Sequence, residues 1–361
     1  MVGPRDEIAG LEPYSWETPT WEIAGRYGLS PYDVVRLDLN TSPYRPVKWL
    51  RRLSRQLEGL GVNLYPDTSY RDLRELLNSY TGAEVQSIMV CNGADEAIDI
   101  LCKAYVGAGR EVLISSPTYS YFRVSAEIMG GQVVSVPRLP NFEDDVDGLL
   151  ASVTRRTAAI FLCSPNNPTG NTMRGDSLKR VLDEFDGLVV VDEAYFEFCG
   201  QTSASLISSY DNLAVVRTFS KAWSLAGARV GYLLAGEDLM RTLNKVRPPN
   251  SLSVISLALA SYALRDRRSM ERWVGSIVGE RERIFRELMR LEGVRPYPSE
   301  ANFILMRFES VDAGWVHEML IRSGLVLRNL SSSPQLRNCL RLTISTPQHN
   351  NAFLNRLRKL L

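Results

Sequence analysis

The stretch that decides the fold runs from Arg217 to Tyr232 and reads RTFSKAWSLAGARVGY. An apolar run, Leu213–Val216, stands before it, and a second apolar run, Val230–Leu234, closes it. Both runs have the length and the β-branched or apolar composition of buried strands. The polar residues between them therefore lie in a strand-to-loop corner, and such corners at the ends of sheet strands are where α/β proteins bind ligands.

The polar side chains of this corner suit a ligand that carries both an aldehyde and a phosphate. Lys221 can join the aldehyde as a Schiff base, which is how proteins hold pyridoxal phosphate. Thr218, Ser220 and Arg229 can bind the phosphate, the arginine through a charge-assisted contact. A lysine in a loop is more often an exposed surface residue, so Lys221 by itself leaves that alternative open. The motifs elsewhere in the chain favour the cofactor site.

The composition restricts the class of protein. The chain has 361 residues, 45% of them hydrophobic, which indicates a globular protein of two domains. Its 42 basic and 41 acidic residues nearly balance, so the protein has no strongly basic surface that would attract nucleic acid or anionic lipid. The only two histidines, His317 and His349, lie late in the chain within helix-like sequence, so we expect neither a Ser-His-Asp triad nor a multi-histidine metal centre, and no metal. The start has no apolar signal-peptide core, and the five cysteines lack C-x-x-C spacing, so we expect a cytoplasmic protein with free thiols.

Strand-like runs alternate with helix-like segments between residues 87 and 235. Several of these runs are apolar throughout, as expected for strands buried on both faces of a mainly parallel sheet. The fold class predicted is therefore α/β, with a large domain built on a mostly parallel mixed sheet flanked by helices. The predicted strands are Ser87–Val90, Glu111–Ile114, Gln132–Val136, Ala158–Leu162, Leu188–Val191, Leu213–Val216 and Val230–Leu234.

The pattern changes after residue 250 and predicts a smaller α+β domain. A long helical stretch covers residues 251–291, and a closing helix covers residues 350–361. Between them lie three strand-like runs, Asn302–Phe308, Leu325–Arg328 and Cys339–Ser345. We predict an N-terminal arm of residues 1–40 that joins the small domain, a large cofactor-binding domain of residues 41–250, and an interdomain helix with the small domain over residues 251–361.

Asp192 ends a buried-type strand, and Tyr195 follows three residues later. An aspartate at the carboxyl end of a sheet can pair with a pyridine nitrogen and keep it protonated, which makes the ring an acceptor for electrons from the substrate. Tyr195 can reach the phenolic oxygen of the same ring. The alternative is an aspartate that caps a helix and a tyrosine that packs in the core.

Three further segments follow predicted strands. Asn167 lies in the turn SPNNPTG, whose prolines and glycine fix it tightly after a buried strand. Gly93, Ala94 and Asp95 open a helix whose free amides can bind phosphate. Tyr119 offers an aromatic face on which a pyridine ring can stack, although a core tyrosine is the commoner arrangement.

Taken together, these motifs resemble the fold-type-I pyridoxal-phosphate aminotransferases. That group has a small-residue helix start, an aromatic, N-P-x-G, D-x-x-Y, and S/T-x-x-K with an arginine eight residues further on. In this chain the matching positions, in the same order, are Gly93-Ala94-Asp95, Tyr119, Asn167–Gly170, Asp192 with Tyr195, and Thr218, Lys221 and Arg229. The resemblance implies that pyridoxal 5′-phosphate is the cofactor and that Lys221, Asp192 and Tyr195 are catalytic.

The finer resemblance is to the histidinol-phosphate aminotransferase branch. In that branch a tyrosine of the partner subunit contacts the cofactor phosphate, and the segment around Tyr65 matches, which implies a homodimer. Arg341 and Arg328 match arginines that hold the substrate anion, and Tyr14 lies in a matching N-terminal segment. Asn40 also matches, but the acidic residue and second asparagine of the branch are replaced by Thr41 and Ser42, near the substrate.

The resemblance implies small-molecule substrates, with histidinol phosphate and 2-oxoglutarate favoured as amine donor and acceptor. An aromatic amino acid remains an alternative donor, because a carboxylate also satisfies the arginines and the Asn40–Ser42 segment departs from the branch. A decarboxylase that acts on threonine phosphate keeps the cofactor but changes the reaction. A non-enzymatic regulator needs a DNA-binding module, and no basic helix-turn-helix segment precedes the fold.

Overall fold

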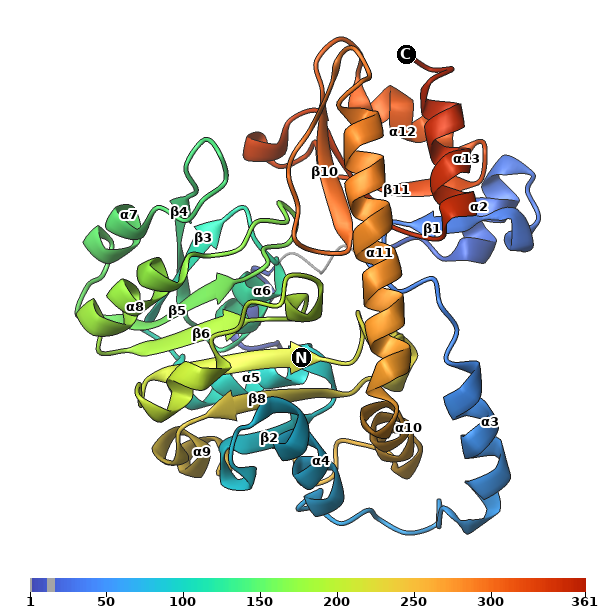
Figure 1. The fold of residues 1–361 in the computed structure, drawn as a ribbon. Coiled ribbons are helices and arrows are strands. Elements are labelled where there is room, and N and C mark those ends of the chain that lie inside the picture. Colours follow the sequence, from blue (N-terminus) through green and yellow to red (C-terminus); the bar gives the residue numbers. More distant parts are fainter. Residues whose placement is uncertain (1, 12–16) are drawn as a thin grey trace.

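A seven-stranded sheet forms the centre of the larger part of the computed structural model, which describes residues 2–11 and 17–361 (Figure 1). Its strand order is β2-β8-β7-β6-β5-β3-β4. All neighbours are parallel except β8, which runs antiparallel to both β2 and β7. The strands are β2 (Ile88–Cys91), β3 (Glu111–Ser116), β4 (Gln132–Pro137), β5 (Thr157–Cys163), β6 (Leu188–Asp192), β7 (Leu213–Thr218) and β8 (Gly231–Ala235).

Helices cover both faces of this sheet, which is why its central strands are mostly apolar. Every residue of β5, β6 and β7 is buried. Alternate side chains of each strand enter two separate hydrophobic clusters, so that Val189 and Val191 pack on one face and Leu188 and Val190 on the other. The expected mostly parallel, doubly covered sheet is confirmed.

A second sheet has five strands in the order β1-β11-β12-β10-β9. Its members are β1 (Val35–Leu37), β9 (Val294–Pro296), β10 (Phe303–Phe308), β11 (Leu325–Asn329) and β12 (Cys339–Thr343). β1 pairs in parallel with β11, so an N-terminal segment forms the edge of a sheet made otherwise of C-terminal strands. In Figure 1 this blue segment lies beside the orange and red elements.

The helices are α1 (Asp6–Ala9), α2 (Thr20–Tyr27), α3 (Val47–Gln56), α4 (Arg71–Thr81), α5 (Gly93–Tyr105), α6 (Tyr121–Ile128), α7 (Val146–Ala151), α8 (Gly175–Glu184), α9 (Glu237–Leu243), α10 (Val254–Arg265), α11 (Arg267–Leu288), α12 (Ala313–Ile321) and α13 (Pro347–Leu357). The long α11 stands beside the small sheet and reaches down toward α10 (Figure 1). Among the described residues, no helix is both long and apolar enough to cross a membrane.

The structure differs from the sequence expectations in three places. The helical stretch expected over residues 251–291 is two helices, α10 and α11, because Asp266 leaves the helical region and its carboxylate accepts hydrogen bonds from Trp49 and Ser269. β1 and β9 were not expected, since each has only three residues. The closing helix begins earlier than residue 350, at Pro347, where Thr346 caps it. The domain boundaries at residues 40 and 250 stay a prediction.

Candidate active site

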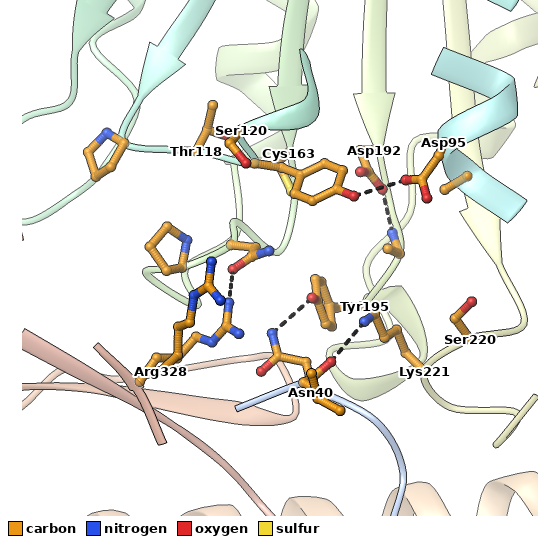
Figure 2. A pocket seen from close by; sticks show the side chains of 18 of the residues that line it. Asn40, Asp95, Thr118, Ser120, Cys163, Asp192, Tyr195, Ser220, Lys221 and Arg328 are labelled. Atoms are coloured by element: carbon orange, nitrogen blue, oxygen red, sulfur yellow. Dashed lines mark hydrogen bonds between the residues drawn. The ribbon is translucent and has the colours of Figure 1, made fainter. Parts of the chain in front are cut away.

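A cavity of about 610 Å³ lies where the carboxyl ends of the large sheet's strands face the small sheet. β3, β5, β6 and β7 all end at it, and β11 and β12 close it from the other side. Figure 2 shows the side chains that point into it. Among the predicted site residues, those lining the cavity are Asn40, Ala94, Asp95, Tyr119, Asn167, Asp192, Tyr195, Thr218, Ser220, Lys221, Arg229, Arg328 and Arg341. The sheet topology therefore brings together residues that are up to about 300 positions apart in the chain.

One end of the cavity is lined with hydrogen-bond donors. Arg229 donates from Nη1 to the Ser220 hydroxyl at 3.3 Å, and the Thr218 hydroxyl donates to the same oxygen at 2.9 Å. Gly93 begins α5 here with φ +86°, and a Cβ at this position would lie 2.6 Å from Nη2 of Arg229. The amides of the first turn of a helix have no acceptor within the helix, so they and the guanidinium form a cradle for an anion.

Lys221 extends into the middle of the cavity. Its Nζ donates a hydrogen bond of 3.4 Å to the carbonyl oxygen of Leu39. Burial, together with the positive charges of Arg341 and Arg229, lowers the pKa of Lys221 to about 8. Because the lowered pKa puts a larger fraction of the amine in its neutral form near neutral pH, Lys221 is suited to attack a carbonyl and to accept a proton.

Asp192 faces the cavity from the last position of β6. The side chain is buried, and its Oδ1 accepts a hydrogen bond of 2.9 Å from the amide of Ala194. Among the described residues no second hydrogen-bond donor reaches this carboxylate, and burial raises its pKa to about 7. A cationic N–H donor placed in the cavity would stabilise the ionised carboxylate.

Tyr195 is held in place by Asn40, which is itself hydrogen-bonded to the small sheet. Its hydroxyl accepts a hydrogen bond of 3.0 Å from Nδ2 of Asn40, whose Oδ1 in turn accepts one of 3.1 Å from the Thr343 hydroxyl. Asn40 has a φ of +52°, a conformation that asparagine tolerates better than most residues, and Asn302 donates to its backbone oxygen at 3.0 Å. Asn40 therefore fixes where the Tyr195 hydroxyl lies.

Two loops of the large sheet supply further polar groups. The Asn167 amide oxygen accepts a hydrogen bond of 2.5 Å from Nη1 of Arg341, so Nδ2 of Asn167 is left for another acceptor. The Tyr119 hydroxyl donates to Asp95 at 2.9 Å, and Asp95 also pairs with Arg229 at 3.0 Å. These contacts orient the residues that flank the middle of the cavity.

The cavity's far side carries two arginines on neighbouring strands. Arg328 of β11 and Arg341 of β12 are directly opposite each other in the antiparallel pair. Nη1 of Arg328 lies 3.3 Å from Oε1 of Glu17, while Nη2 of Arg341 donates to the carbonyl of Asp38 at 2.6 Å and its Nε is buried without a partner in the described part of the chain. Like charges directly opposite each other destabilise a sheet, so the pair favours an anionic ligand between them.

Among the predicted site residues that the structure describes, Gly93 and Tyr65 do not line this cavity, and several lining or supporting residues were not predicted. Tyr65 is 86% exposed and does not line the cavity, and Tyr14 lies outside the described residues. Sequence reasoning missed Glu17, Asp38, Asn302, Phe303 and Thr343. Only the nearness of Asp38 to Asn40 in sequence could have indicated one of them. Glu17 reaches the site through its ion pair with Arg328, and the others reach it from the small sheet and the segment that leads into it.

Residues 32–357 match the family model described as aminotransferase class I and II. The chain belongs to this family and is a pyridoxal-phosphate-dependent transaminase of fold type I. It is 34% identical to the histidinol-phosphate aminotransferase of Thermoanaerobacter pseudethanolicus over 359 residues, which cover 99% of this chain and 98% of the relative. It is 36% identical to the enzyme of the same name from Cytophaga hutchinsonii, with 98% and 97% of the two chains covered.

A solved structure agrees with this assignment. The histidinol-phosphate aminotransferase of Sinorhizobium meliloti in complex with pyridoxal 5′-phosphate superposes with a TM-score of 0.88 at 26% identity, covering 99% of this chain and 98% of that one. The cavity described above fits this cofactor. The cavity has room for pyridoxal phosphate, and the helix start at Gly93 forms a cradle for its phosphate that an added Cβ would fill. The buried carboxylate of Asp192 faces the cavity, and among the described residues it accepts a hydrogen bond from one donor.

Proposed function

We propose that this transaminase moves an amino group between histidinol phosphate and 2-oxoglutarate. The observation that carries the proposal is the pair of facing arginines, Arg328 and Arg341, at the substrate side of the cavity. Two adjacent guanidinium groups suit a phosphate dianion and also a carboxylate. The curated relatives that cover nearly the whole chain act, by name, on histidinol phosphate.

The roles of the cofactor-binding residues follow from their positions. Bound pyridoxal phosphate supplies a C4′ aldehyde that takes up the amino group and a pyridine ring that withdraws electrons from the substrate's Cα. The amides of Gly93, Ala94 and Asp95, the hydroxyls of Thr218 and Ser220, and Arg229 would hold the phosphate. Tyr119 would lie against the ring, and Asn167 and Tyr195 would donate to its phenolic oxygen.

Two side chains would handle protons. Asp192 would hold a proton on the pyridine nitrogen through its ionised carboxylate, which is buried and therefore strengthened as a partner for a cation. Lys221 would hold the cofactor between turnovers and, once displaced by the substrate amine, would move a proton between the substrate's Cα and C4′ with its Nζ. Residues of the small sheet line one side of the cavity, and a substrate bound against them would limit the access of water to that proton transfer.

One substrate-binding site must accept two substrates in turn. Glutamate would place its α-carboxylate on Arg341, and histidinol phosphate would place its phosphate in the same region, between Arg341 and Arg328. Glu17 pairs with Arg328 across 3.3 Å, so a substrate anion must compete with this carboxylate. A dianion competes better than a monoanion, which favours the phosphate over an aromatic amino acid's carboxylate at this position.

A half-reaction titration tests the substrate. The enzyme in its lysine-bound cofactor form is mixed separately with histidinol phosphate, phenylalanine, tyrosine and threonine phosphate, and conversion to pyridoxamine phosphate is followed by absorption. We expect efficient conversion by histidinol phosphate and a loss of that conversion, much more than of conversion by phenylalanine, in Arg328→Ala. Conversion by phenylalanine but not by histidinol phosphate would identify an aromatic aminotransferase, and carbon dioxide release from threonine phosphate would identify a decarboxylase.

We also infer that the enzyme is a homodimer whose sites are shared. The support is Tyr65, which lies in the segment 57–65 together with exposed Leu57, Val62 and Leu64. An exposed apolar segment of this kind is typical of a subunit interface. Such an arrangement would let Tyr65 contact the cofactor phosphate in the partner subunit. We further place the enzyme in the cytoplasm, as its five unpaired cysteines favour.

A further inference from the structure

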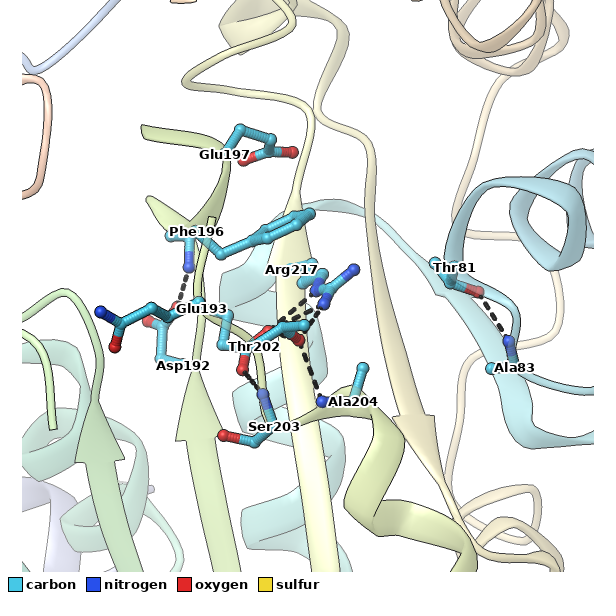
Figure 3. Close-up of polar contacts among 12 residues, drawn as sticks. Thr81, Ala83, Asp192, Glu193, Phe196, Glu197, Thr202, Ser203, Ala204 and Arg217 are labelled. Carbon is cyan, nitrogen blue, oxygen red and sulfur yellow. Dashed lines mark hydrogen bonds and ion pairs between the residues drawn. The ribbon is translucent and has the colours of Figure 1, made fainter. Parts of the chain in front are cut away.

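A buried polar network lies at the carboxyl ends of β6 and β7 (Figure 3). Its charged side chains lie on the opposite face of the sheet from Asp192 and Thr218, because successive side chains of a strand alternate between the two faces. Its centre is Arg217, which donates from Nε and Nη2 to Oε2 of Glu193 at 3.0 and 2.9 Å. The side chains of Arg217 and Glu193 are only 3% and 2% exposed. Neither side chain lines the cavity, so neither is explained by contact with cofactor or substrate.

Further contacts fix the guanidinium in one orientation. The Phe196 ring lies 3.6 Å from the Cζ of Arg217, and the Thr202 hydroxyl accepts from Arg217 while donating to Glu193 at 2.8 Å. The Tyr232 hydroxyl of β8 lies 3.5 Å from Nη1. The network therefore joins β7, β8 and the loop that follows β6.

The two charged residues are sequence neighbours of two proposed cofactor contacts. Glu193 follows Asp192, and Arg217 precedes Thr218. Asp192 is aligned with Val216 in the parallel pair, which places Glu193 beside Arg217 on the face opposite the cavity. Because successive side chains of a strand point to opposite faces, an ion pair on the back face sets the separation of Asp192 and Thr218 on the front face.

The loop that carries Lys221 is connected to the same region. Trp223 donates from Nε1 to Oε1 of Glu197 at 2.8 Å, and Glu197 lies one residue after Phe196, whose ring packs on Arg217. Tyr80 of α4 reaches the same carboxylate oxygen at 3.5 Å. The segments that carry Asp192, Thr218 and Lys221 are thus each anchored from behind by a buried polar contact.

A buried ion pair contributes little net stability, because the cost of removing both charges from water offsets their attraction. Its directional hydrogen bonds, however, fix the geometry of the strands that carry it. We propose that Arg217 is a positioning residue that, through Glu193, holds Asp192 and Thr218 at the spacing required by the pyridine nitrogen and the phosphate of one cofactor molecule. This inference rests on the cofactor contacts in the proposed function.

The test removes both charges, so that neither is left buried alone. In the double variant Glu193→Gln/Arg217→Met, we expect a folded protein whose dissociation constant for pyridoxal phosphate rises about tenfold or more, equivalent to 1.4 kcal/mol or more. The ¹⁵N resonance of pyridine-labelled cofactor should move toward the value of the unprotonated ring. Arg217→Lys keeps the charge but not the forked contact, and we expect a smaller shift of both measurements in the same direction.

Arg281→Met is the matched control, because this buried arginine donates to the Ala301 carbonyl in the small domain at 3.0 Å and does not touch the network. It should lower the melting temperature without moving the ¹⁵N resonance. Wild-type affinity and resonance in both network variants would overturn the proposal, and so would an equal effect of Arg281→Met. If the double variant does not fold, Arg217→Lys decides between these outcomes.

Asp192→Asn tests the proposed function separately. If this variant leaves the ¹⁵N resonance unchanged, Asp192 does not hold the proton on the pyridine nitrogen, whatever the network variants show.

Discussion

Lys221 is the residue on which the proposed chemistry depends. Lys221→Ala should lose the visible absorption of the lysine-bound cofactor, yet keep cofactor bound through the cradle at Gly93 and Arg229. Absorption spectra and borohydride reduction followed by peptide mapping measure this. Lys179→Ala on α8, which removes an exposed lysine, is the control and should behave as the wild type. A reduced cofactor found on any other lysine of the wild-type protein contradicts the assignment.

The lowered pKa of Lys221 leads to a second prediction, which concerns how fast its amine reacts with the cofactor at different pH values. Only the neutral amine attacks an aldehyde, and burial lowers the pKa of Lys221 to about 8, from about 10.4 for a free lysine. The rate at which cofactor-free protein takes up pyridoxal phosphate should therefore rise about tenfold per pH unit below pH 8 and level off above it. Stopped-flow absorption across pH 6 to 10 measures the profile. A rate that still rises steeply at pH 10 would mean that the amine is not desolvated in this way.

Asp192 should matter more to turnover than to folding. Asp192→Asn cannot carry the negative charge that stabilises a protonated pyridine nitrogen, so kcat should fall by about two orders of magnitude or more. The melting temperature should stay close to that of the wild type, since burial raises the pKa of Asp192 to about 7 and a neutral side chain costs less to bury. Steady-state kinetics and thermal unfolding measure the two effects. Near-normal turnover would rule out the proposed role.

At the scale of elements, the start of α5 is the part of the site most sensitive to backbone shape. Gly93→Ala adds a Cβ that would lie 2.6 Å from Nη2 of Arg229, at a φ of +86° that alanine rarely adopts. We expect this variant to lose about 1–3 kcal/mol of stability, and its affinity for pyridoxal phosphate to fall because Arg229 is displaced.

Gly107→Ala is the control for this variant, because an added Cβ there meets nothing within 4 Å. Denaturant unfolding and equilibrium cofactor binding compare the two proteins. Equal cofactor affinity in Gly93→Ala and Gly107→Ala would show that this helix start does not form the phosphate cradle.

The helices and strands could be predicted from the sequence where the local pattern of apolar residues determines them. All seven strands of the large sheet were predicted to within two residues at each end, most of them because fully buried strands read as continuous apolar runs. β1 and β9 were missed, since three residues carry too little pattern and their pairing depends on distant strands. The break at Asp266 was missed because it depends on Trp49, which lies more than 200 residues earlier.

In the site, too, the residues placed by local sequence pattern could be predicted, and those placed by contacts between distant segments could not. Residues that follow strands of the large sheet, such as Asp192 and Lys221, could be placed from sequence because parallel strands present their carboxyl ends at one edge. Thr343 and Asn302 could not be placed, because they reach the site only through hydrogen bonds to Asn40 that require the small sheet to be formed. Asn40 itself was named from resemblance, and its contact with Tyr195 gives it a physical role.

At the scale of the whole molecule, the cavity belongs to neither sheet alone. Asn40, Arg328 and Arg341 approach from the side of the small sheet, and Asp192 and Lys221 from the large one. A displacement of one sheet relative to the other would therefore separate the proposed substrate anchors, Arg328 and Arg341, from the proposed base, Lys221. Tyr65 stands outside this arrangement in a single chain, being 86% exposed, so its proposed role requires a second copy.

Hybrid dimers test that role. In a shared-site dimer of Lys221→Ala with Tyr65→Ala, one site lacks both residues and the other has both, the lysine from one subunit and the tyrosine from its partner. Mixing the two impaired homodimers in equal amounts should therefore restore up to about a quarter of the wild-type sites, since half of randomly paired dimers are hybrids with one complete site each. Native mass spectrometry verifies the subunit exchange, and Tyr32→Ala, which removes a tyrosine that is 98% exposed, should leave activity unchanged. If Tyr65 acted within its own chain, neither site of the hybrid would be complete, and exchange without recovered activity would refute the shared site.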